Sequence, residues 1–109
     1  MIERTSFDSI AMHEKTIAQL SASLAAGEFS SEELTRALLE RVERFNPSLN
    51  AFITVTAESA LAQARAADER RRQGAAGLLT GIPIAHKDIF CTDGVRTSCG
   101  SRILDRFIA

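Results

Sequence analysis

The sequence predicts an α/β fold in which helices alternate with short strands of one sheet. Two observations support this class. Two capping-box patterns are each followed by apolar residues at helical spacing. Two short apolar segments, residues 50–55 and 81–88, then carry strand-like composition. The resulting order of helix, helix, strand, helix, strand needs more strands than 109 residues supply, so we expect the sheet to be incomplete in this chain.

Residues 1–12 lack clear hydrophobic periodicity, and Glu3, Arg4 and Asp8 interrupt any apolar centre of a signal peptide. We therefore expect residues 1–12 to be a poorly ordered leader or extension. The domain is predicted to occupy residues 13–109.

The first predicted helix starts at a capping box formed by Thr16 and Gln19, three positions later. Apolar residues then recur on one helical face, and Gly27 offers a stop: Ile17, Leu20 and Leu24. A short amphipathic helix is expected here.

The second predicted helix repeats the pattern with Ser30 and Glu33. Its apolar face follows helical spacing: Leu34, Leu38, Val42 and Phe45. Because proline disfavours the helical conformation in the residue before it, the helix is predicted to end before Asn46 and Pro47.

Residues 50–55 are rich in β-branched and aromatic side chains and predict a short strand, with Thr56 as a possible N-cap. An alanine-rich helix is predicted from Ala57 to about Gln73, ended by glycine at position 74. Residues 81–88 contain Pro83 and predict an edge or initial strand. Residues 91–101 are dense in Thr, Ser, Gly and Asp and predict an ordered loop.

The charge balance restricts the function classes. Thirteen basic and fourteen acidic residues leave a net charge of -1, which disfavours direct binding of nucleic acid or anionic membranes by this segment. No apolar run approaches the length of a bilayer span, so a cytoplasmic protein is expected. Cys91 and Cys99 are predicted to be unconnected thiols, and His13 and His86 are too few for a metal site.

Lys87 stands at the end of an apolar segment and admits two interpretations. Its stem can pack on apolar surface while the ammonium reaches water, which is the common structural arrangement. Alternatively, the amine is withdrawn from water, which disfavours its charged form and lets it act as a base near neutral pH. Local sequence alone leaves both open.

Residues 81–88 read Gly-Ile-Pro-Ile-Ala-His-Lys-Asp, and Gly94, Thr97 and Gly100-Ser101 follow. This pattern resembles the first signature block of the amidase-signature family. The resemblance implies a central mixed sheet covered by helices, with Lys87 as the base of a Ser-cisSer-Lys triad. The two serines of the triad belong to a later block that residues 1–109 do not contain. His86 departs from the pattern, because many relatives carry an apolar residue there.

Three neighbouring residues are expected to have structural roles. Asp88 is predicted to fix a turn or to accept hydrogen bonds, since it projects away from the lysine if the strand continues. Ser98 and Ser101 belong to the loop of the first block and are expected to shape that loop.

Residues 29–34, 50–54 and 90–101 are similar to the glutaminase subunits (A subunits) of amidotransferases that form Gln-tRNA(Gln). The resemblance implies that glutamine is the substrate and that the amidotransferase subunits B and C are partners in a heterotrimer. It also implies that Glu-tRNA(Gln) is met through the complex, which uses ATP with Mg, while this segment holds no cofactor or metal. Lacking the serines, the 109 residues alone are expected to be inactive. A stand-alone amidase and a non-catalytic truncated fragment are the alternatives.

Overall fold

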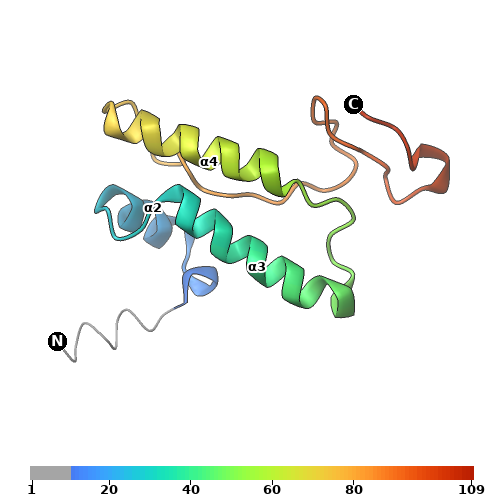
Figure 1. Ribbon diagram of the computed structural model, residues 1–109, viewed down its shortest axis with the longest axis horizontal. Helices are drawn as coiled ribbons and strands as arrows, with labels where there is room; N and C mark the ends of the chain where they lie inside the picture. Colours follow the sequence, from blue (N-terminus) through green and yellow to red (C-terminus); the bar gives the residue numbers. More distant parts are fainter. Residues whose placement is uncertain (1–10) are drawn as a thin grey trace.

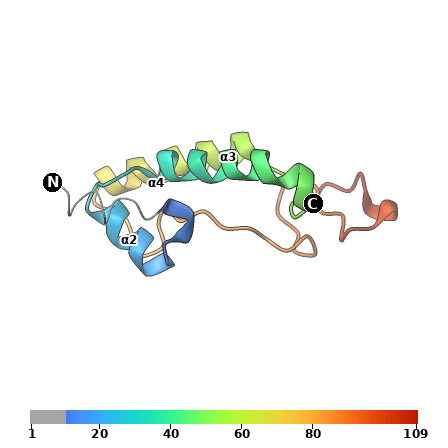
Figure 2. The ribbon, with the colours of Figure 1, turned by 90° about the horizontal axis from the view of Figure 1, so that it is seen from below.

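The computed structural model describes residues 11–109, which form three α-helices, two short 3-10 helices and long irregular connections (Figure 1). The elements follow in the order η1 (Met12–Glu14), α2 (Ile17–Ala25), α3 (Ser31–Leu49), α4 (Ala57–Arg72) and η2 (Arg102–Leu104). The molecule measures 55 × 35 × 20 Å. Helices α3 and α4 lie side by side as an antiparallel pair, and α2 lies below them in Figure 2.

The predicted leader, residues 1–12, falls almost wholly outside the described residues. Met12 begins η1 and packs against the apolar core formed by α2 and α3. The boundary at residue 13 stays a prediction.

Both predicted capping boxes are confirmed. At the start of α2, the Gln19 N–H donates to the Thr16 hydroxyl at 3.2 Å, and the Thr16 N–H donates to the Gln19 side-chain oxygen at 2.9 Å. At the start of α3, the corresponding bonds between Ser30 and Glu33 measure 3.0 and 2.9 Å. Such N-caps stabilise a helix by about 1 kcal/mol each.

The prediction that the second helix ends before Asn46 is wrong, because α3 continues to Leu49 with Pro47 in its last turns. Proline lacks only one main-chain donor, and its neighbours replace that support here. Asn50 adopts the left-handed conformation at φ 55° and donates its N–H to the Asn46 carbonyl at 2.7 Å. The Asn46 side chain also exchanges two hydrogen bonds with the main chain of Phe52, at 2.8 and 3.0 Å.

Helix α4 matches its prediction from Ala57 onward. Thr56 occupies the N-cap position, although its side chain makes no capping bond. Ala64 and Ala67 are buried, which lets the main chain of α4 approach α3 closely. Gly74 follows the helix at φ 77°, a left-handed conformation that glycine adopts without a side-chain clash.

The core is small and lies where α2 meets the first turns of α3. Leu20, Leu24 and Leu34 are its buried members, and further residues pack around them: Met12, Phe29, Leu38 and Ile82. Gly81 reaches the same place at φ 87°, and its carbonyl accepts a hydrogen bond from the Ser31 hydroxyl at 2.8 Å. The segment that leads to Lys87 is therefore anchored to the helices at its beginning.

The two strand predictions, residues 50–55 and 81–88, are not confirmed. Neither segment forms a strand within residues 11–109, so only the helical part of the predicted α/β fold is observed. A strand requires main-chain partners, and the described residues place none beside these segments. The one β-bridge of this region joins Arg96 to Ile108. None of the helices between residues 11 and 109 is long and apolar enough to cross a membrane.

Candidate functional site

Lys87 occupies the first position of a tight turn. The irregular segment 82–87 leads to it from the core, and the Phe90 N–H donates to the Lys87 carbonyl at 3.1 Å to close the turn. The lysine side chain is exposed, and its ammonium makes no hydrogen bond or ion pair with residues 11–109. The described residues thus leave the amine in water.

Large apolar side chains surround this turn and are exposed as well. Ile84 is 73% exposed, Ile89 51% and Phe90 57%. The ring of His86 meets Phe90 edge to face, with 6.2 Å between ring centroids. Neighbouring exposed apolar side chains of this size are typical of a surface that another part of a protein covers.

Asp88 is held firmly by the loop of residues 98–100. The Ser98 N–H lies 3.1 Å from both carboxylate oxygens, and the Ser98 hydroxyl donates at 2.5 Å. The Gly100 N–H reaches the same carboxylate at 3.4 Å, and the Cys99 N–H donates to the Asp88 main-chain carbonyl at 2.9 Å. Bonds to the charged form, chiefly from the Ser98 hydroxyl, lower the pKa of Asp88 below its ordinary value.

The structural roles predicted for three residues are confirmed by these contacts. Asp88 accepts hydrogen bonds in a turn, and Ser98 is 2% exposed with its hydroxyl committed to Asp88. The Ser101 hydroxyl accepts the Ile103 N–H at 3.2 Å and caps η2. Both hydroxyls are therefore used in shaping the loop.

Arg96 connects this loop to the rest of the chain, a role that no local sequence pattern indicates. Its guanidinium bonds the side chain and carbonyl of Asp105 and the Thr54 hydroxyl, the last at 3.1 Å. Main-chain bonds between residues 94–97 and 107–109 run alongside, such as Thr97 N–H to the Phe107 carbonyl at 3.0 Å. The loop behind Lys87 is consequently tied to the segment after α3.

Cys91 and Cys99 are free, exposed thiols, as predicted. His13 lies 3.7 Å from Glu14, and His86 contacts Phe90. Residues 11–109 contain no group of three or more His, Cys, Asp or Glu side chains that could hold a metal ion.

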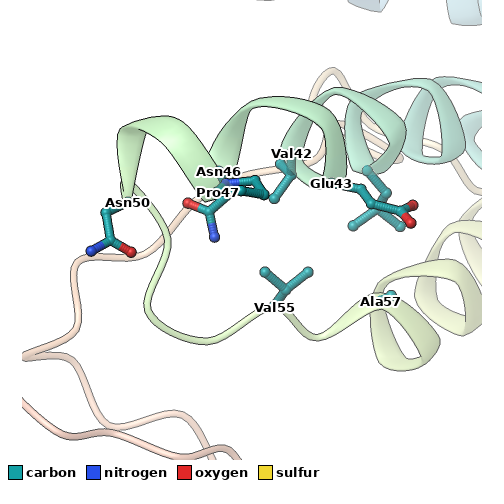
Figure 3. A pocket seen from close by; sticks show the side chains of 8 residues that line it. Val42, Glu43, Asn46, Pro47, Asn50, Val55 and Ala57 are labelled. Carbon is teal, nitrogen blue, oxygen red and sulfur yellow. The ribbon is translucent and has the colours of Figure 1, made fainter.

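A hollow of about 440 Å³ lies elsewhere, between the end of α3 and the segment leading into α4 (Figure 3). Val55 faces Val42 and Pro47 across it, and Glu43 lies at one side. The full lining is Leu39, Val42, Glu43, Asn46, Pro47, Asn50, Val55 and Ala57. Lys87 and Asp88 do not line this hollow.

The chain belongs to the Amidase family, whose family model matches residues 33–109, a range that includes Lys87 and the loop that binds Asp88. Among curated proteins, it is similar to the A subunits of glutamyl-tRNA(Gln) amidotransferases from three bacteria. The identities over 98 residues are 67% for Thioalkalivibrio sulfidiphilus, 68% for Methylococcus capsulatus and 64% for Halorhodospira halophila. Each match covers 90% of this chain and 20% of the relative, so the chain spans about a fifth of the relatives' length. The resemblance inferred from residues 81–101 is thereby confirmed.

Proposed function

We propose that this chain is the N-terminal segment of the glutaminase subunit of a glutamyl-tRNA(Gln) amidotransferase, and that Lys87 is the base of its amide hydrolysis. The carrying observation is the 67% identity over 98 residues to the T. sulfidiphilus relative, together with the family match across Lys87. The relatives' names support the tRNA-dependent reaction over a stand-alone amidase.

In the proposed mechanism, the neutral amine of Lys87 accepts a proton from a bridging serine. That serine takes the proton of the nucleophilic serine as it attacks the carboxamide carbon of glutamine. Ammonia leaves with the returned proton, and water then hydrolyses the glutamyl ester. Both serines come from protein outside these 109 residues, because Ser98 and Ser101 are committed to the loop.

Lys87 has to lose its contact with water for this role, since an exposed ammonium remains charged at neutral pH. The apolar side chains around it support such a change. Ile84, Ile89 and Phe90 are each more than half exposed, and covering them with the remainder of the subunit would exclude water from the same surface.

The remaining components are assigned to other parts of a cytoplasmic complex. Of subunits B and C, the former would use ATP with Mg to activate the glutamate of Glu-tRNA(Gln), and the latter would brace the heterotrimer. The net charge of -1 supports placing the tRNA contact outside this segment. The 109 residues alone would hydrolyse no glutamine.

A chimeric glutaminase subunit tests the proposal. The 98 matched residues of the T. sulfidiphilus relative are replaced by those of this chain, and the chimera is assembled with that organism's subunits B and C. Glutamine-dependent conversion of Glu-tRNA(Gln) to Gln-tRNA(Gln) is expected within about tenfold of the unmodified complex.

The control is the same assay with ammonium chloride in place of glutamine, which bypasses amide hydrolysis. A chimera that works with ammonia and fails with glutamine would show that this segment does not support the glutaminase reaction. Hydrolysis of other small amides in preference to glutamine would favour the stand-alone amidase instead.

A further inference from the structure

Three consecutive residues direct their main-chain donors at one side chain and its carbonyl. The N–H groups of Ser98 and Gly100 bind the carboxylate of Asp88, and the Cys99 N–H binds the Asp88 carbonyl at 2.9 Å. The Ser98 hydroxyl adds the shortest of these bonds, at 2.5 Å. We call residues 98–100 with these donors the Asp88 cradle.

The cradle depends on an unusual backbone. Cys99 and Gly100 are both left-handed, at φ 54° and 69°. In such a turn, successive N–H groups point to one side and form a concave site for an anion. A left-handed conformation is uncommon for cysteine, so the loop holds Cys99 in this state against its own preference. The anion that occupies the site is the side chain of Asp88.

The location of the cradle gives it a relation to Lys87. Lys87 and Asp88 are the first two residues of the turn that the Phe90 N–H closes. On the other side, the segment is anchored by the bond between Gly81 and Ser31 and by the packing of Ile82 on the core. Because the lysine side chain contacts no partner of its own in residues 11–109, these two anchors set where its main chain lies.

We propose that Asp88 is a positioning residue for Lys87, because the Asp88 cradle fixes the main chain from which the lysine amine reaches the serine pair. This inference rests on the proposed function of Lys87. Proton transfer needs donor and acceptor atoms about 2.6–3.2 Å apart. A displacement of about 1 Å at a reacting group can cost about 10²-fold in rate. The lowered pKa of Asp88 is consistent with a carboxylate that stays ionised, and the cradle stays closed, at neutral pH.

Three variants of the chimeric complex measure the effect on glutamine hydrolysis. Ser98→Ala keeps the main-chain bonds and is expected to lower kcat about tenfold, whereas Asp88→Ala is expected to lower it about 10²-fold. Asp88→Asn retains an acceptor oxygen and should fall between them. KM for glutamine is expected to change less than about threefold, because substrate binding is not altered. Transamidation driven by ammonium chloride should be unchanged, which shows that the complex is assembled.

Asp93→Asn is the matched control, since Asp93 is an exposed carboxylate of the same loop with no hydrogen bond or ion pair to the described residues. It should leave kcat unchanged. If Asp88→Ala does not fold, Ser98→Ala carries the test alone. Wild-type kcat in the cradle variants, with Lys87→Met inactive, would overturn this inference and leave the proposed function standing. Equal losses with glutamine and ammonia would also overturn it, because they would show a purely structural role.

Discussion

The carboxylate of Asp68, in α4, accepts the main-chain N–H of Ser31 at 2.7 Å and so caps the neighbouring helix α3. Its second oxygen accepts the N–H of Glu32 at 3.1 Å, and the Ser30 hydroxyl accepts the next N–H, from Glu33. The first three free donors of α3 are thus satisfied, two of them by another helix. An anion at this end is also favoured by the helix dipole.

Asp68→Ala is therefore expected to lower the free energy of unfolding of the 109-residue chain by about 1–2 kcal/mol. Urea unfolding followed by helical circular dichroism measures the change. Glu69→Ala is the control on the same helix, because Glu69 pairs only with exposed Arg72 and Gln73 and should cost less than about 0.5 kcal/mol. Equal effects of the two variants would contradict the role assigned to Asp68.

Gly81 packs directly against the start of α3. A Cβ added to it would lie 3.0 Å from the Cβ and hydroxyl oxygen of Ser31. Gly74 has a similar positive φ, but a Cβ there meets nothing within 4 Å. Gly74→Ala is expected to cost about 1 kcal/mol for the strained backbone alone. Gly81→Ala should cost about 1–3 kcal/mol more, because Ser31 has to move.

The same urea experiment distinguishes packing from backbone strain at Gly81. Adding Ser31→Gly to Gly81→Ala removes the clashing side chain but also the hydrogen bond to the Gly81 carbonyl. A double variant less destabilised than the sum of the single ones would support the contact. Indistinguishable unfolding of Gly81→Ala and Gly74→Ala would refute it.

Glu32 links α3 and α4 through two arginines. Hydrogen bonds from Arg65 and Arg36, each 3.0 Å long, lower the pKa of Glu32 below its ordinary 4.5. A carboxyl whose pKa falls on folding contributes stability above its unfolded pKa and loses it as the pH drops through the folded value. The chain should therefore lose stability as the pH falls below about 4.5, and Glu32→Gln should reduce that dependence.

The measurement is the urea midpoint between about pH 6 and pH 3. Glu40→Gln is a suitable control, because Glu40 is an exposed carboxyl of α3 with no bond to the described residues. The acid dependence should persist in Glu40→Gln. A Glu32→Gln profile parallel to wild type would mean that the ion pairs add nothing to folding.

The sequence predicted those features that are determined within a few residues. The capping boxes at Thr16 and Ser30 follow from side chains three positions apart, and both helices begin there. The continuation of α3 through Pro47 was missed because it depends on Asn46 and Asn50 compensating for the lost donor. The strands were not confirmed because their pairing needs main-chain partners that local composition does not provide.

The site divides in the same way. The spacing around Lys87 indicated the family, which the comparison confirmed, while its role as a base stays a prediction. Hydrogen bonding by Asp88 was predicted from its place beside a turn. The partners of Asp88 and of Asp68 were not, since each bond joins residues ten or more positions apart. The left-handed Cys99, on which the cradle depends, carries no local signal.

The rate of glutamine hydrolysis by the chimeric complex carrying Lys87→Met tests the central claim most directly. Methionine fills a similar volume but has no amine to accept a proton. We expect kcat to fall by at least about 10³-fold, while ammonia-dependent transamidation stays at the level of the unsubstituted chimera. Glutamine hydrolysis within about threefold of the unsubstituted chimera would show that Lys87 is not the base.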